Sequence, residues 1–226
     1  HGVPPDILRA QIDAVVEDIG VDAVKIGMLH APEVVQVVAD AIRRHQLPNV
    51  VLDPVMVATS GDRLIAEETV GQLVRELFPL AALVTPNLDE GGWLLGRQIT
   101  REDELDAAAD ELLALGARAV LLKGGHLNGD VVMDVLGQQG QAAVDYLRLR
   151  SQRIATHNGH GTGCTLSSAI AAHLAMGDSL PQAVAKARNY VLGAIVAGAH
   201  VHTGQGHGPL NHGWAPAVQT ASVPQP

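Results

Sequence analysis

Short apolar runs alternate with helix-type patterns along most of this chain, and this alternation restricts the fold more than any other feature. Residues 49–53 and 119–123 are almost continuous in valine, leucine and alanine, which is typical of strands buried on both faces. Segments such as 32–44 lie between these runs and carry apolar residues at helical spacing. Buried strands joined by helices predict a mostly parallel, doubly wound sheet inside a three-layer α/β/α domain.

The same patterns define the expected elements. We expect helices at residues 7–19, 32–44, 66–78, 87–95, 103–115, 162–176 and 180 to about 200. We expect parallel strands at residues 23–27, 49–53, 81–85 and 119–123. Two further runs, 131–137 and 142–154, are joined by a glycine-bounded turn and predict a hairpin at an antiparallel edge of the sheet. Residues 214–226, rich in Ala, Pro and Gln, are expected to form a flexible tail.

Charge and composition exclude several classes of protein. The chain has 226 residues with 15 Lys+Arg against 24 Asp+Glu, a formal net charge of −9, and its basic residues form no run. This distribution argues against a nucleic-acid partner. There is no apolar run of the roughly 18 residues that a membrane span needs, and no signal-peptide pattern. A single cysteine cannot form an internal disulfide. Together with the missing span and signal pattern, this predicts a cytoplasmic protein with no membrane partner.

Polar residues follow several of the expected strands. Lys25 lies within the first, Asp53 ends the second, Thr85 and Asn87 end the third, and Lys123 ends the fourth. Ligands bind beyond the carboxyl ends of strands in sheets of this kind. Each residue is a weak signal when taken alone, because a solitary Asp or Asn in this position is more often a cap or a turn former.

The strongest local signal is the segment from His160 to Thr165, which places two glycines and Cys164 at the start of an apolar helix. The first amides of a helix have no partner within it and favour an anion, which predicts an anion hole here. The same field favours thiolate over thiol, so Cys164 could act as a base or a nucleophile. The alternative interpretation is an ordinary glycine-rich turn with Cys164 packed inside the protein.

Six motifs, taken in order, resemble one known family. They are Lys25–Leu29, Asp53–Met56 with Thr59–Asp62, Thr85–Glu90, Lys123–His126, His160–Cys164 and Gly206–Pro209. Together they are similar to the hydroxymethylpyrimidine/phosphomethylpyrimidine kinases of thiamin biosynthesis, members of the ribokinase-like superfamily. The resemblance runs from about residue 7 to residue 214. It implies ATP-dependent phosphorylation of 4-amino-5-hydroxymethyl-2-methylpyrimidine, and then of its monophosphate to the diphosphate.

The resemblance also implies roles for individual residues at the reacting end of the site. Cys164 resembles the general base of the family, and Gly161, Thr162 and Gly163 resemble its anion hole. Glu90, in an Asn-x-x-Glu motif, resembles a support for Mg²⁺ and its waters.

Other residues are implied to bind the phosphates, the nucleotide and the substrate. Asp53 would lie near the metal and the phosphates. Lys123, Gly125 and Asn87 match positions on the nucleotide side. Met28 and Val55 match positions that line the pyrimidine pocket. The implied cofactors are ATP and Mg²⁺, the implied partner is a small-molecule substrate, and a homo-oligomer is expected because the superfamily often forms them.

The chain departs from the family at three places. In the loop after Asp53, where the family varies between Lys and Thr, Thr59 precedes Ser60 and no extra lysine is available. Asn158-Gly159 stands where the family usually has Asn-Thr, which removes a hydroxyl beside the nucleotide loop. The glycine-rich opening of the family has no counterpart before His1, so we expect an N-terminally incomplete kinase domain over residues 1–213, with weak nucleotide binding and little turnover. Two alternatives follow, a pyridoxal or pyridoxine kinase of the same superfamily and a truncated nucleotide-binding chain without turnover.

Overall fold

One six-stranded sheet organises the computed structural model, which describes residues 2–57, 63–202 and 204–216. The strands follow one another across the sheet in chain order, as β1 (Val24–Ile26), β2 (Val50–Leu52), β3 (Leu83–Val84), β4 (Ala119–Leu122), β5 (Val131–Gln139) and β6 (Val144–Gln152). β1 to β4 pair in parallel, whereas β5 pairs antiparallel with both β4 and β6. The predicted parallel sheet with a hairpin at its antiparallel edge is confirmed.

The helices lie where the apolar spacing predicts them. They are α1 (Pro5–Asp18), α2 (Pro32–His45), α3 (Glu67–Glu76), α4 (Leu88–Leu95), α5 (Leu105–Leu113), α6 (Thr162–Ala175) and α7 (Leu180–Gly198). The helix expected at residues 66–78 ends early, and a 3-10 turn at Phe78–Leu80 follows it, because Pro79 has no backbone N–H to continue the α-helical hydrogen bonds. Within the described ranges, no helix is long and apolar enough to cross a membrane.

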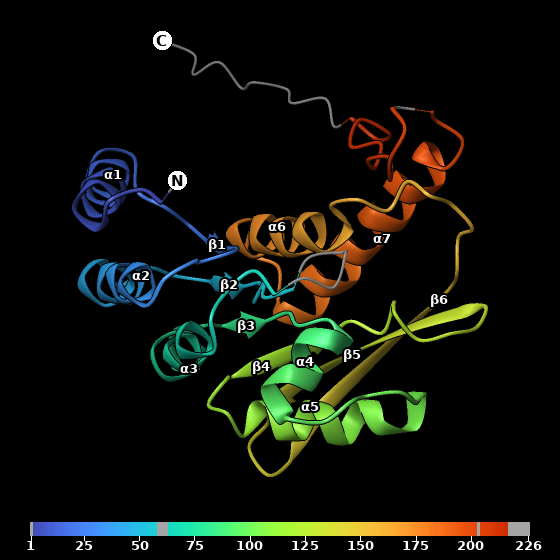
Figure 1. Cartoon of the computed structure of the whole chain (residues 1–226), viewed down its shortest axis with the longest axis horizontal. Coiled ribbons are helices and arrows are strands. Elements are labelled where there is room, and N and C mark those ends of the chain that lie inside the picture. The colour runs from blue at the N-terminus through green and yellow to red at the C-terminus, as the bar shows by residue number, and fades with distance from the viewer. Residues whose placement is uncertain (1, 58–62, 203, 217–226) are drawn as a thin grey trace.

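Helices cover both faces of the sheet, which makes the domain three-layered (Figure 1). Alternate residues of each strand point to opposite faces. Leu52 and Val84 pack in a core with α2, α3 and α5, whereas Val51 and Leu83 pack in a second core with α6 and α7. Burial on both faces explains why these strands are apolar at every position rather than at every second one.

Helix α1 is an exception, because none of its residues is buried. Ile7 and Val15 are each about half exposed, although their spacing predicts a helix with one buried face. The helix is joined to α2 by polar contacts, in which the carboxylate of Asp13 meets Arg44 and, at 2.7 Å, His45. The spacing therefore identified the helix correctly but did not identify what would cover it.

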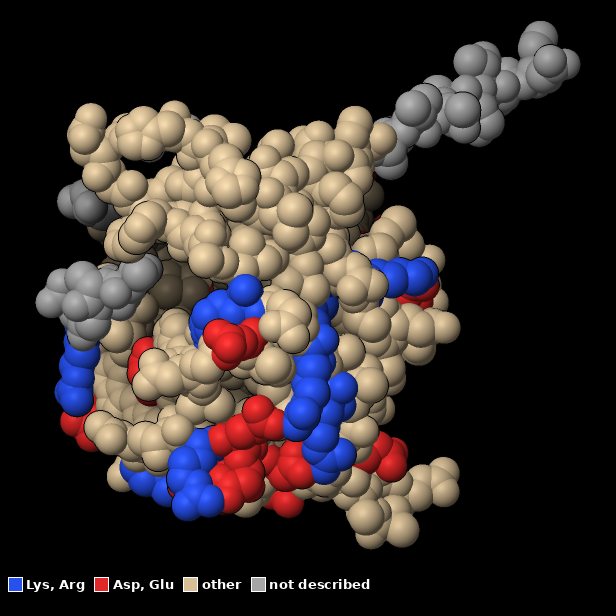
Figure 2. Space-filling model, turned by 90° about the vertical axis from the view of Figure 1, so that its right-hand side faces the viewer, with Lys and Arg blue, Asp and Glu red and all other residues tan. Residues whose placement is uncertain are grey.

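Opposite charges alternate on the outer face of the hairpin, in the lower half of Figure 2. Arg148 of β6 pairs with Asp106 of α5, and Arg150 pairs with Glu102. All four side chains are exposed, and exposed ion pairs of this kind add little to stability. The same view shows few charges on the upper part of the molecule, and a hollow between this upper part and the charged lower part.

Candidate active site

The polar residues after β2, β3 and β4 meet at one edge of the sheet. The strand ladder continues beyond the assigned strands, because Asp53 N donates to Ile26 O and Thr85 N donates to Leu52 O, each at 2.9 Å. Lys123 N donates to Pro86 O at 2.9 Å. These backbone bonds fix Asp53, Thr85 and Lys123 beside one another, as expected for neighbouring parallel strands.

Asp53 is the centre of this edge, and its side chain is almost fully buried at 1% exposure. Its Oδ1 accepts hydrogen bonds from Thr85 Oγ1 at 3.1 Å and from Lys123 Nζ at 3.0 Å. Its Oδ2 accepts one from Ser167 Oγ at 3.2 Å and lies 3.7 Å from Lys25 Nζ. A buried carboxylate needs such partners, and two lysines compensate its charge.

Glu90 belongs to the cap of α4. Its backbone N–H donates to Asn87 Oδ1 at 2.9 Å, and its Oε2 accepts from Asn87 N at 2.7 Å. This reciprocal pair is a capping box, which explains the Asn-x-x-Glu spacing structurally. Burial raises the pKa of Glu90 to about 7, against a lowering by the charge of Lys123, and the negative charge of Asp53 raises it further. Two carboxyl groups therefore interact across this edge, one of them poised to hold or release a proton near neutral pH.

The raised pKa of Glu90 predicts a pH-dependent stability. The folded chain binds a proton on Glu90 up to about pH 7, whereas an unfolded Glu titrates near 4.5, so ionisation destabilises the fold as the pH rises between these values. In metal-free buffer, Glu90→Gln keeps an oxygen that can accept from Asn87 N and removes the free-energy cost of ionising a buried carboxyl group. We expect the variant to gain roughly 2–3 kcal/mol over wild type between pH 5 and pH 8 in urea unfolding.

The exposed Glu68 of α3 supplies the matched control for this measurement, because Glu68→Gln makes the same carboxyl-to-amide change at a position without burial. Its unfolding free energy should follow that of the wild type across the same pH range. An equal pH dependence in wild type and Glu90→Gln would contradict the role of burial at Glu90.

The glycine loop places the start of α6 opposite these carboxylates. Gly161 is the residue before the helix and has φ of 87°, a left-handed conformation that favours glycine. No side chain caps α6, within the part of the chain that the structure describes. Thr162 Oγ1 donates instead to Gly159 O at 2.7 Å, which fixes the loop itself. The amide of Thr162 also donates to Gly159 O, at 3.3 Å, so an anion at this end of α6 would meet the amides of Gly163 and Cys164.

Cys164 lies in this first turn and its side chain is exposed. The alternative interpretation, a cysteine packed inside the protein, is wrong. Lys123 closes the other side of the loop, because a Cβ on Gly163 would lie only 3.1 Å from Lys123 Nζ. The sulfhydryl, the lysine and the free end of the helix thus share one wall of the site.

A cleft of about 1050 Å³ joins these parts. Ten of the sequence-predicted site residues line it, namely Asp53, Val55, Asn87, Glu90, Lys123, Gly125, Gly161, Thr162, Gly163 and Cys164. The remaining one, Met28, is half exposed in the loop after β1 and does not line the cleft. Residues 58–62, which include the predicted Thr59–Asp62 motif, lie outside the described part of the chain.

Several residues of the cleft were not anticipated from the sequence. Val191, Leu192 and Ile195 of α7 form an apolar wall, and the buried pair of Asp134 and Arg188 lines the cleft beside it. Sequence spacing predicted α7 only as a closing helix, and no motif distinguishes residues of this wall from ordinary packing residues. The cleft therefore combines a polar end at the strands with an apolar end at α7.

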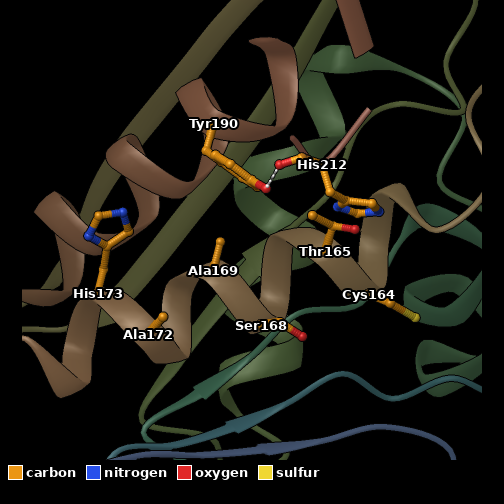
Figure 3. A pocket seen from close by; sticks show the side chains of 8 residues that line it. All are labelled: Cys164, Thr165, Ser168, Ala169, Ala172, His173, Tyr190 and His212. Carbon is orange, nitrogen blue, oxygen red and sulfur yellow. Dashed lines mark hydrogen bonds between the residues drawn. The ribbon is translucent and has the colours of Figure 1, made fainter. Parts of the chain in front are cut away.

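A shallower groove of about 560 Å³ lies between α6 and α7, on the other side of Cys164 (Figure 3). Tyr190 Oη donates to His212 O at 2.8 Å across it, and the thiol of Cys164 points away from the tyrosine ring. Trp214, at the start of the predicted tail, packs on Tyr190 with ring centroids 6.2 Å apart. Residues 217–226 of that tail lie outside the described residues.

Comparisons with known proteins relate the chain to one enzyme family. A family model described as phosphomethylpyrimidine kinase matches residues 1–211. The hydroxymethylpyrimidine/phosphomethylpyrimidine kinase of Rhizobium meliloti is 47% identical over 211 residues, which are 93% of this chain and 77% of that protein. The thiamine biosynthesis bifunctional protein ThiED of Geobacter sulfurreducens is also 47% identical, over 94% of this chain, but the chain spans only 42% of its length.

Solved structures of two kinases share the ribokinase-like fold of this chain. The ADP complex of Bacillus subtilis pyridoxal kinase superposes with a TM-score of 0.85 at 36% identity, covering 94% of this chain and 78% of that one. The phosphomethylpyrimidine kinase of Clostridium difficile gives a TM-score of 0.73 at 35% identity, covering 86% and 78%. This chain belongs to the phosphomethylpyrimidine kinase family.

Proposed function

We propose that this chain transfers the γ-phosphoryl group of ATP to the hydroxymethyl oxygen of 4-amino-5-hydroxymethyl-2-methylpyrimidine, and then phosphorylates the monophosphate to the diphosphate. One observation carries the proposal, the cleft that brings Cys164 together with Asp53, Glu90 and Lys123. The names of the relatives that match nearly the whole chain support it. The kinase domain that we propose spans residues 1–213, with residues 214–226 as a tail.

The first transfer is a displacement at phosphorus. Cys164 Sγ, as the general base, takes the hydroxymethyl proton while the alcohol oxygen bonds to the γ-phosphorus, and the bond from that phosphorus to the ADP oxygen breaks. Negative charge grows on the transferring group during this step, and catalysis consists mainly of stabilising that charge and aligning the reactants. The amide of Gly163 at the start of α6, together with Lys123 Nζ, supplies positive potential on that side of the cleft, whereas the amide of Thr162 donates to Gly159 O at 3.3 Å.

The acidic residues fit Mg²⁺ held largely by phosphates. Asp53 and Glu90 line one cleft and interact electrostatically, and carboxylate oxygens are the ligands that Mg²⁺ prefers. Mg²⁺ usually takes one or two carboxylates and completes its shell with phosphates and waters. Among the described residues no cluster of three or more metal-binding side chains exists, which agrees with such a partial protein site. When bound, Mg²⁺ would neutralise phosphate charge.

The remaining parts of the cleft suit the two substrates. The apolar wall of Val191, Leu192 and Ile195 offers a surface for the base of a nucleotide, with Lys123 and Gly125 toward its phosphates. Val55 lines the same cleft as Asp53 and Cys164, two residues after Asp53 in the chain, and there it could contact a pyrimidine alcohol. Val55 lines the cleft, which supports its proposed role in binding the pyrimidine. Met28 is half exposed and does not line the cleft, so its position gives less support for the same role.

The test is an ADP-release assay with ATP and Mg²⁺, run with hydroxymethylpyrimidine, its monophosphate or pyridoxal. We expect release with both pyrimidines, and a kcat/KM at least about tenfold below theirs for pyridoxal, since each misplaced polar group in a pocket costs about that much. Preference for pyridoxal would make the chain a pyridoxal kinase. ADP binding without turnover on any alcohol would support the nucleotide-binding alternative and contradict the proposal.

A further inference from the structure

The turn from Lys123 to Gly129 forms the wall of the cleft where β4 ends, and its shape depends on side chains outside it. Lys123 and Gly125 line the cleft, and both belong to the nucleotide side in the function proposed above. The turn has one internal backbone hydrogen bond, from Leu127 N to Gly124 O at 3.1 Å. A turn with so little internal bonding needs other contacts to keep a single conformation.

Arg153 provides such contacts on the outer side of the turn. Its Nε donates to Gly129 O at 2.7 Å, its Nη1 donates to Gly125 O at 2.9 Å, and its Nη2 donates to Leu127 O. Three carbonyl oxygens of one turn thus converge on a single guanidinium group. Carbonyl dipoles that point at a common centre repel one another, so this conformation of the turn needs a cation between them.

The hairpin register explains why Arg153 reaches the turn. Gln152, the last residue of β6, pairs with Val131, the first residue of β5. Arg153 follows directly and donates its backbone N–H to Asp130 O at 2.7 Å. The ladder therefore places the base of the Arg153 side chain beside the end of the turn, and the planar fork of an arginine can bond several oxygens at once.

A second contact holds the inner side of the same turn. Gly124 N donates to Asp134 Oδ1 at 2.9 Å, and Asp134 Oδ2 accepts from Arg188 Nε at 2.8 Å. A side chain at position 124 would collide with the carbonyl oxygen of Met133, so the turn packs directly against β5. The turn is held between Asp134 on the inside and Arg153 on the outside.

We propose that Arg153 is a positioning residue for the nucleotide, which acts by holding the Lys123–Gly129 turn in the conformation that binds phosphates. This inference rests on the proposed function, because it concerns the ATP site of the kinase. Arg153 itself lines the cleft, but its guanidinium group spends its hydrogen bonds on three backbone oxygens of the turn. Its effect on a ligand passes through Lys123 and Gly125.

The experiment compares Arg153→Ala and Arg153→Lys with Arg150→Ala, a matched control that removes an exposed arginine of β6 paired with Glu102. Hydrogen–deuterium exchange of residues 124–130 is measured first, in the free chain. We expect exchange about tenfold faster or more in Arg153→Ala only, since the turn loses its outer contacts. The exchange rate in Arg153→Lys should lie between those of wild type and Arg153→Ala, because an ammonium group cannot bond three oxygens in the planar arrangement of a guanidinium group.

Titration with ADP in a calorimeter follows, and then kinetics. We expect the dissociation constant for ADP and the KM for ATP to rise roughly tenfold in Arg153→Ala, while kcat at saturating ATP stays within about threefold, because binding must now order the turn. If wild type binds ADP and Arg153→Ala binds it equally well, or its exchange is unchanged, Arg153 is not a positioning residue. If wild type binds no ADP, the proposed function itself fails, and this inference fails with it.

Discussion

Replacing Cys164 with alanine is expected to lower turnover by roughly 10²- to 10⁴-fold, the usual contribution of a general base. The expectation rests on the position of Cys164, exposed in the first turn of α6 and in the lining of the same cleft as Asp53 and Lys123. Alanine keeps the helix and removes only the group that accepts the proton. Affinity for ADP should therefore change by no more than about twofold, because a group used only in the transition state adds nothing to ground-state binding.

Ser168→Ala is the control for the cysteine variant. Ser168 lies one turn further along α6, is exposed, and lines the shallow groove between α6 and α7 rather than the cleft. Its replacement should leave turnover within about twofold of wild type, as is usual for a surface change away from the reacting groups. Wild-type turnover in Cys164→Ala would remove Cys164 from the mechanism, even if the rest of the kinase assignment stands.

The second large effect is on stability, and it concerns Arg188. Asp134 and Arg188 are each less than 10% exposed and are bonded at 2.8 Å, and Arg188 also donates to Val132 O at 3.2 Å and Ser151 Oγ at 3.0 Å. Arg188→Met leaves the carboxylate of Asp134 buried without its cation. We expect a loss of roughly 3–5 kcal/mol in the free energy of unfolding measured in urea, the usual cost of breaking a buried ion pair.

A second substitution separates loss of the pair from loss of packing. Asp134→Asn, added to Arg188→Met, removes the unpaired charge and keeps an oxygen for the amide of Gly124, so it should restore part of the lost stability. Arg148→Met on the same hairpin removes an exposed arginine that pairs with Asp106, and should cost only a small fraction of the loss. A loss in Arg188→Met no larger than in Arg148→Met would contradict the account of the buried pair.

The elements and most of the site could be predicted from the sequence because each has a local signature. Buried parallel strands are apolar at every position, so β2 and β4 were recognisable without a structure. Asp53 and Lys123 directly follow such strands, and the topology brings residues in that position to a common edge. Cys164 follows a glycine loop at the start of an apolar helix, which is visible in the sequence.

Other features depend on contacts between distant segments, which local patterns do not encode. Asp134 and Arg188 are 54 residues apart in the chain, and neither has a neighbour in sequence that indicates the other. Ser167 bonds to Asp53, although a serine in the middle of an apolar helix is indistinguishable from a packing residue. For α1, the spacing of apolar residues specified a face of the helix but not a partner for that face.

The position of Asp53 connects these observations to the chemistry. Its two oxygens are shared among Thr85, Ser167 and two lysines, and a divalent cation bound here would compete with the lysines for them. Lys123 would then be free to approach phosphate oxygens, since it already faces the glycine loop. The proposed reaction therefore uses residues that are already close together and needs no large rearrangement of the sheet edge.

The most direct test of the central claim identifies the product. The chain is incubated with ATP, Mg²⁺ and 4-amino-5-hydroxymethyl-2-methylpyrimidine and followed by ³¹P nuclear magnetic resonance, with Cys164→Ala in a parallel sample. We expect a phosphomonoester signal to appear as the γ-phosphate signal of ATP declines, followed by the two signals of a pyrimidine diphosphate, and neither in the Cys164→Ala sample on the same timescale. Loss of the γ-phosphate signal to inorganic phosphate alone, or no loss at all in the wild type, would contradict the claim that this cleft transfers a phosphoryl group to the pyrimidine alcohol.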